Sequence, residues 1–227
     1  MNGIRKYLAL AIGFAIGCHA LSAAAIIYHF TGTTDVAITE GSNTIPSGTP
    51  FSGTFSYDDG QIGTVTPFQG GTQSVFTFNF LTLTIAGQTV TTGTGSLGLY
   101  NDVTTSPSGV PNGDSLFTFV PGIPNNSPNP SSGSINGITP NFIYLSFVDP
   151  TGTAFSGSGL PSNLNLLQFS QAVLGLNYGP LGAGDIDTVH PLSSLTSSQA
   201  IPDSGSTLLL LFGPCAAMLL SRLKEQL

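Results

Sequence analysis

The feature of this sequence that most constrains its fold is the alternation of apolar and polar residues over Ser74–Gly87, which reads SVFTFNFLTLTIAG. A period of two residues predicts a β-strand, and both Phe and Thr favour strands. We therefore expect one unbroken strand with two distinct faces. One face would carry Val75, Thr77, Asn79, Leu81, Leu83 and Ile85, and the other would carry Phe76, Phe78 and Phe80.

Comparable short runs recur along the chain. Phe51, Phe55 and Tyr57 alternate in one of them, which ends at the turn signal Asp58–Asp59–Gly60. No stretch keeps a sustained period of 3.6 residues, and Leu164–Leu176 is the one segment that could form a short helix. The further strand candidates are Ile26–Thr31, Val36–Glu40, Thr89–Thr92, Ser96–Tyr100, Ser115–Val120, Phe142–Val148, Leu164–Phe169 and Ile186–His190.

This pattern predicts an all-β fold, an antiparallel β-sandwich that is jelly-roll-like, over residues 26–192. The polar stretches Thr104–Gly113 and Pro121–Pro140 are expected to be surface loops. Residues 193–200 are interpreted as a short polar linker. An N-terminal signal helix and a C-terminal hydrophobic helix are expected outside the domain.

The charge distribution limits what the domain can bind. All four Lys and Arg residues lie at the two ends of the chain, whereas Ile26–Ala200 contains nine acidic residues and neither Lys nor Arg. A domain without cations cannot neutralise phosphates, which excludes nucleic acid as a partner. It also cannot form Lys or Arg salt bridges, so its stability must come from apolar burial and backbone hydrogen bonds.

The N-terminus has the parts of a secretory signal peptide over residues 1–25. The basic residues Arg5 and Lys6 precede the apolar run LALAIGFAIGCHALSA, and small residues follow it. Cleavage is expected after Ala24 or Ala25. Two alternatives stay open. One is an uncleaved N-terminal anchor, and the other is cleavage at AIGC, which resembles a bacterial lipobox and would make Cys18 a lipidated first residue.

The last residues, 201–227, combine three segments. The motif Ile201–Gly205 reads IPDSG, Thr207–Leu220 is an apolar run of 14 residues, and residues 221–227 form a basic tail with Arg222 and Lys224. The run is shorter than the about 20 helical residues that cross a bilayer core. It has no polar face, unlike a surface helix, and the positive charge directly after it would hold that end on the cytoplasmic side.

This order of motif, apolar segment and basic tail resembles the PEP-CTERM sorting signals of Gram-negative bacteria, in the variant whose motif reads Val-Pro-Asp-Ser-Gly. Ile201 stands in place of the Val, and the remaining motif residues match: Pro202, Asp203, Ser204 and Gly205. The opening of the domain, YHFTGTT…PFSGTFSYDDG, also resembles that of many proteins with such a tail. The tail departs from the family in its Gly213–Pro214 break and its small number of basic residues.

The resemblance implies processing by a signal peptidase and by an exosortase, a membrane protease-transpeptidase that reads the motif and cuts near it. It implies export from a Gram-negative bacterium, a transient inner-membrane anchor, and delivery to the cell surface, outer membrane or extracellular matrix. Members of the family are associated with exopolysaccharide, biofilm and floc matrix. The expected function is therefore that of a non-enzymatic surface or matrix protein, with exopolysaccharide as a partner.

Few residues of the domain could support catalysis. His29 and His190 are its candidate bases, and the Ser-rich segment Ser156–Gly159 lacks nucleophile-elbow spacing. Both cysteines, Cys18 and Cys215, lie in the hydrophobic ends, so the domain has neither a disulfide framework nor a cysteine metal cluster. We expect no catalytic residues and no enzymatic activity.

Two pairs of aspartates are weak candidates for a calcium site. Asp58 and Asp59 lie in a predicted turn, and Asp185 and Asp187 follow the segment GPLGAG. Aspartates beside glycines can supply oxygens to Ca²⁺, which takes about six to eight of them. Turn formation is the simpler role for both pairs. No cofactor is expected apart from a structural Ca²⁺ at one of them.

The alternative function is that of a carbohydrate-binding, lectin-like β-sandwich, assisted by calcium and sorted by the same tail. Sugar-binding modules often present exposed Trp and Tyr rings, but this domain has no Trp. We expect most of its tyrosines to pack in the core or on strand faces instead. These are Tyr28, Tyr57, Tyr100, Tyr144 and Tyr178.

Overall fold

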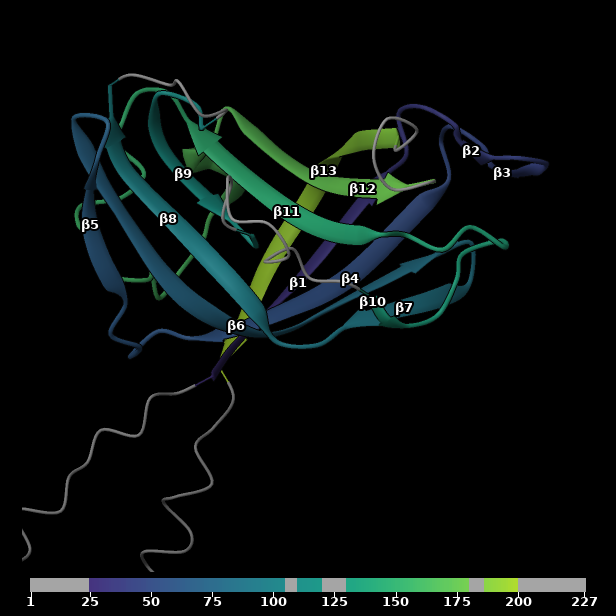
Figure 1. Cartoon of the computed structure of the whole chain (residues 1–227), viewed down its shortest axis with the longest axis horizontal. Helices are drawn as coiled ribbons and strands as arrows, with labels where there is room; N and C mark the ends of the chain where they lie inside the picture. Colours follow the sequence, from purple (N-terminus) through teal and green to yellow (C-terminus); the bar gives the residue numbers. More distant parts are fainter. Residues whose placement is uncertain (1–24, 105–109, 120–129, 180–185, 200–227) are drawn as a thin grey trace, which may run out of the picture. The chain divides into compact units, whose positions relative to one another are not determined.

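The computed structural model describes residues 25–104, 110–119, 130–179 and 186–199 (Figure 1). Their regular structure is antiparallel β-strand, with one turn of 3₁₀ helix. The strands are β1 (Ala25–Thr33), β2 (Ile38–Glu40), β3 (Asn43–Ile45), β4 (Pro50–Asp58), β5 (Thr64–Phe68), β6 (Gly71–Ile85), β7 (Gln88–Thr92), β8 (Gly95–Val103), β9 (Gly113–Phe117), β10 (Pro130–Ser132), β11 (Phe142–Asp149), β12 (Gln171–Tyr178) and β13 (Ile186–Gln199), and the 3₁₀ turn is η1 (Leu166–Gln168).

The main sheet has the order β10-β7-β6-β4-β1-β13-β12-β11-β9-β8, and β8 pairs with β6 as well. This last pairing closes eight strands, from β6 through β1 and β11 back to β8, into an antiparallel barrel. β5 pairs with β6 beside the barrel, and β7 with β10 extends from the other half of β6. The β2–β3 hairpin forms a separate two-stranded sheet (Figure 1).

The predicted β-sandwich is wrong. A sandwich consists of two sheets packed face to face, whereas here one sheet closes on itself through the β6–β8 ladder. The alternation in the sequence does not distinguish the two architectures, because the strands of both bury every second residue. The predicted signal helix and C-terminal helix lie outside the described residues. Within the described residues, no helix is long and apolar enough to cross a membrane.

The two predicted faces of β6 are also wrong, because this strand contains a bulge. Ser56 of β4 pairs with Phe80, but the next residue, Tyr57, pairs with Phe78, so Asn79 is an extra residue in the ladder. One extra residue moves every later side chain to the opposite face. The core-facing residues of β6 are therefore Phe76, Phe78, Leu81, Leu83 and Ile85.

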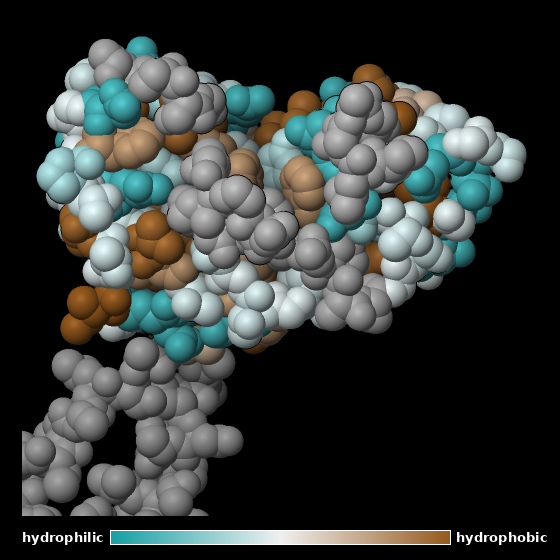
Figure 2. Space-filling model, viewed as in Figure 1, coloured by the Kyte–Doolittle hydropathy of each residue, from teal (hydrophilic) through white to brown (hydrophobic). Residues whose placement is uncertain are grey.

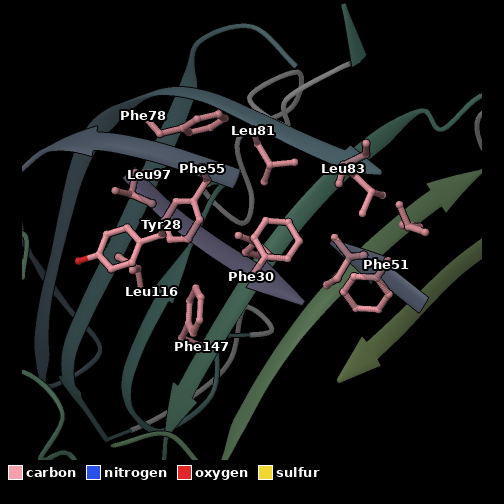
Figure 3. Close-up of a cluster of buried hydrophobic side chains, with 14 of the residues drawn as sticks. Tyr28, Phe30, Phe51, Phe55, Phe78, Leu81, Leu83, Leu97, Leu116 and Phe147 are labelled. Atoms are coloured by element: carbon pink, nitrogen blue, oxygen red, sulfur yellow. The ribbon is translucent and has the colours of Figure 1, made fainter. Parts of the chain in front are cut away.

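Aromatic and aliphatic side chains from across the barrel meet in its interior (Figure 3). The rings of Tyr28 and Phe55 stack with centroids 4.9 Å apart, and Phe147 lies 6.2 Å from Phe55. The buried Tyr57 hydroxyl donates to the carbonyl oxygen of Pro161 at 2.6 Å. The predicted packing role of the tyrosines is confirmed, since each of the five is at most 8% exposed.

Two glycines make room for phenylalanine rings inside the barrel. Gly53 lies opposite Phe30 in the β1–β4 ladder, and Gly32 lies opposite Phe51. A Cβ atom on either glycine would overlap the ring of its partner. Small residues opposite large rings let the two strands approach without a void, which is how aromatic side chains stabilise glycines within strands.

Two local predictions near the C-terminal half are corrected. Residues 193–199, expected as a linker, form the second half of β13, where Ser194 pairs with Thr31 and Gln199 with Ile26. Leu164–Phe169 is not a strand, and Leu164–Leu176 is not a helix. The chain makes the short η1 turn, capped by the Asn165 side chain, and then enters β12.

We predict that Gly53→Ala destabilises the protein by about 1–3 kcal/mol, because the added methyl group overlaps both the Phe30 ring and the Thr82 carbonyl oxygen. Urea unfolding followed by circular dichroism measures the change. Gly93→Ala is the matched control, since a Cβ there has no neighbour within 4 Å. Equal stability of the two variants would contradict this account of the core.

Candidate functional site

The predicted calcium ligands do not come together in the described residues. Asp58 ends β4 beside Ala25, close to the Ile26–Gln199 pair, and Asp59 follows in the turn. Asp187 lies at the opposite end of β13 from Gln199. Asp185 lies outside the described ranges. No group of three or more His, Cys, Asp or Glu side chains within those ranges is arranged to hold a metal ion.

Asp187 interacts with an aromatic hydroxyl. The Tyr144 hydroxyl donates to Asp187 Oδ2 at 3.0 Å, across the outer face of the barrel wall. Burial, followed by the nearby negative charge of Asp187, raises the pKa of Tyr144 above its ordinary value. This carboxylate therefore serves as a hydrogen-bond acceptor for a buried tyrosine.

A buried carboxylate that the sequence analysis did not single out, Asp149, fixes the turn after β11. Its Oδ1 accepts from the backbone N–H and hydroxyl of Thr151, at 2.9 and 2.6 Å. Its Oδ2 accepts from the N–H and hydroxyl of Thr153 and from the N–H of Ala154, at 2.8, 3.1 and 3.0 Å. Burial alone would raise the pKa of Asp149, but these hydrogen bonds outweigh it and lower the pKa to about 2.

The neighbouring carboxylate of Asp114 secures the same region. Asp114 pairs with Asp149 in the β9–β11 ladder and is fully buried. Its two oxygens accept from the N–H groups of Asp102 and Phe155, at 2.9 and 2.7 Å. The sequence signal for this network was Asp149 followed by Pro-Thr-Gly-Thr, which is turn chemistry. Both carboxylates are occupied by internal donors and act as structural anchors.

His190, one of the two candidate bases, is fully buried and faces the barrel interior. Its Nδ1 lies 2.9 Å from Asp35 Oδ1, in the connection between β1 and β2, while the Asp35 side chain is 54% exposed. The hydrogen bond with His190 lowers the pKa of Asp35. His190 Nε2 has no hydrogen-bond partner among the described residues. The ring lies near Phe51, with centroids 6.5 Å apart, so its surroundings are those of the core.

The outer face of five adjacent strands, β13, β1, β4, β6 and β7, carries two neighbouring rows of side chains, of which nine are Ser or Thr and one is His29. Strand register places Thr31 opposite both Ser194 and Ser52, and Ser52 opposite Thr84. We call the following ten residues the hydroxyl surface. One row is Thr196, His29, Thr54, Thr82 and Thr91, and the other is Ser194, Thr31, Ser52, Thr84 and Thr89.

Every residue of the hydroxyl surface is exposed or half-buried, whereas the residues between them along each strand face the core. His29, the second candidate base, lies in this surface with Thr196 and Thr54 opposite it. A pocket of about 520 Å³ is adjacent, and Thr31, Ser52 and Thr84 form part of its lining. The sequence contained this surface as alternate Ser and Thr residues, but the strand register was needed to align them.

Exposed hydrophobic side chains are scattered over the described residues. Ile62 is 100% exposed and Leu167 is 92% exposed, and they lie in separate turns. On the face that Figure 2 presents, hydrophobic patches are small and separated by polar and neutral residues. Large contiguous apolar patches are what mark protein or membrane contacts.

The sorting motif, basic tail and signal-cleavage residue Ala24 lie outside the described ranges.

We predict that Asp149→Asn lowers the free energy of unfolding by about 2–3 kcal/mol at pH 7, because the amide cannot accept all of the hydrogen bonds. The folded pKa of about 2 lies below the ordinary 3.8, so the stabilisation is complete above about pH 5 and is lost as pH falls towards 2. Urea unfolding at several pH values measures both effects. Asp59→Asn is the control, and a pH-independent difference between Asp149→Asn and the unaltered protein would contradict the assignment.

A second pair of variants tests the His190–Asp35 contact. Asp35→Ala leaves the buried Nδ1 of His190 without a partner and should lower the free energy of unfolding by about 1–2 kcal/mol. Asp35→Asn keeps an acceptor oxygen and should lower it by less than half as much. Thermal unfolding at pH 7 compares the two. Equal decreases in stability for the two variants would show that the hydrogen bond between His190 and Asp35 does not contribute to stability.

Comparison of the chain with protein-family models, with curated proteins and with solved structures gave no match.

Proposed function

We propose that this chain is an exported, non-enzymatic protein of the cell surface or extracellular matrix, processed at both ends. The observation that supports the proposal most directly is the pairing of β1 with β13, in which Ile26 lies opposite Gln199. The first and last strands are therefore neighbours. The beginning of β1 and the end of β13 lie at the same end of the barrel. Of the expected signal-cleavage positions, Ala24 directly precedes β1 and Ala25 is the first residue of β1, and the IPDSG motif begins two residues after Gln199.

Processing at these positions would leave every strand of the barrel in place. Ala25 pairs with Asp58, so cleavage after Ala24 keeps every residue of β1, and cleavage after Ala25 removes one pair. Every residue of β13 precedes the motif, so a cut within Ile201–Gly205 removes no strand. A protein that is cut at both ends must keep its folded domain after the two cuts, and the positions of β1 and β13 allow this.

The partners proposed on this basis are a signal peptidase and an exosortase during processing, the inner membrane while the tail is held, and exopolysaccharide afterwards. The absence of Lys and Arg between Ile26 and Ala200 continues to argue against nucleic acid. No catalytic residue and no cofactor are proposed. The hydrogen bonds of Asp114 and Asp149 support structural roles for these buried carboxylates.

We predict that replacing Pro202–Gly205 with four alanines leaves a membrane-held chain that still ends at Leu227, because an exosortase could no longer read the motif. Intact mass spectrometry of the membrane and medium fractions measures the outcome. The unaltered protein should begin at Ala25 or Ile26 and end near Pro202–Gly205, and any extra mass there would identify an attached anchor.

The matched control replaces Glu225 and Gln226 with alanine, which changes the tail but leaves the motif intact. This control should be processed like the unaltered protein. Release of the motif variant at the normal rate would exclude recognition of the motif. An unaltered chain that still ends at Leu227 in the producing cells would make the tail a simple membrane anchor.

A further inference from the structure

We propose that the hydroxyl surface binds a neutral polysaccharide. This inference deepens the proposed matrix function, since it names the chemical class of the partner and the face of the barrel that contacts it. Its ten residues come from five neighbouring strands: β13, β1, β4 and β6 belong to the barrel wall, and β7 extends the sheet beside it.

The charge of the surface selects the class of ligand. None of its residues is acidic, Lys or Arg, and His29 is its one titratable side chain. Binding of a phosphorylated, sulfated or uronic polymer would require cations, and the domain contains neither Lys nor Arg. An uncharged polymer meets no electrostatic penalty on such a face.

The hydroxyls can both donate and accept hydrogen bonds. Three pairs bond across strands: Thr31 to Ser194 at 2.6 Å, Thr54 to Thr82 at 2.7 Å, and Thr84 to Thr89 at 2.8 Å. Each such pair uses one of its two protons, so a proton and several lone pairs remain for a ligand. Sugar hydroxyls have the same dual character, which makes the two sets complementary.

Apolar contact is available at one border of the surface. Ile27 and Phe80 flank Ser56 in the next row of the same strands, and both are half-buried. Such side chains can cover the C–H faces of sugar rings while the hydroxyl rows bond their edges. At the other border lies the open pocket that Thr31, Ser52 and Thr84 help to line.

The extent of the surface favours a polymer over a single sugar. Adjacent strands lie about 4.8 Å apart, so a row across five strands is about 19 Å long. A protein partner is a poorer match, because protein interfaces concentrate Trp, Tyr and Arg at their centres and this surface has none of them. The same lack of Trp and Tyr means that a bound polysaccharide would be held by the hydroxyl rows and by Ile27 and Phe80 instead of by stacking on Trp or Tyr rings.

The test measures binding of the protein, purified from the cells that make it, to cellulose, dextran and alginate by co-sedimentation and affinity electrophoresis. We expect binding to at least one of the two neutral glucans, little change between 50 and about 500 mM salt, and none to alginate. Binding to neither neutral glucan, or a preference for the anionic alginate, would overturn the proposal.

Variants locate the site. Thr31, Thr84, Thr89 and Thr196 are changed together to Val, which keeps side-chain shape and strand preference but removes four hydroxyls. Affinity should fall at least tenfold. The matched control changes Thr39, Thr44, Thr64 and Thr66 to Val, all exposed and away from the surface, and should stay within twofold. An equal loss in both sets would overturn the assignment of this face.

A single Ser52→Val variant, at the wall of the pocket, provides a second measurement if the fourfold variant does not fold, and should weaken binding at least threefold. An unchanged affinity of the Ser52→Val variant would show that the ligand does not contact the pocket side of the surface. The location of the protein in the cell is measured separately by intact mass. A correctly exported protein that binds no glucan overturns this inference alone, and a glucan-binding protein that is never processed overturns the proposed export alone.

Discussion

The backbone ladder between β6 and β8 is the interaction on which the rest of this structure depends. Without it, the sheet would be an open ribbon, and its inward side chains would remain partly in water. Closure removes the two long edges and gathers the inward rings of Tyr28, Phe55 and Phe147 into one interior. It is possible because β6 is 15 residues long and holds different partners on its two halves.

The absence of Lys and Arg from Ile26–Ala200 determines how this domain stabilises its carboxylates. In a domain without Lys or Arg, negative charges must be stabilised by neutral donors, and Asp149 accepts five hydrogen bonds from the turn that follows it. The one ion-pair geometry among the described residues joins Asp35 to the buried His190. The hydroxyl surface contains no acidic residue, Lys or Arg. The proposal of a neutral ligand rests on this lack of charge.

Much of the local structure was predictable, because alternation directly reflects which side of a strand meets water. The strand predictions for Phe51–Tyr57 and Phe142–Val148 are confirmed. The bulge at Asn79 was missed, although the adjacent apolar residues Phe80 and Leu81 already break the alternation there. The segment Ser193–Gln199 was taken for a linker because it is polar. It is a strand because the neighbouring strand β1, and not its own hydrophobicity, provides its hydrogen bonds.

The sequence by itself determined most of the strands and the absence of Lys and Arg from the domain, because both depend on residue type and short-range order. The tertiary structure alone decided that the sheet closes into a barrel, that His190 meets Asp35, and that Ser and Thr residues from five strands align into the hydroxyl surface. These features depend on register between strands that are far apart in the chain, such as the pairing of His29 with Thr196 and of Thr31 with Ser194. Register is set by the packing of all inward side chains together, which no local stretch of sequence specifies.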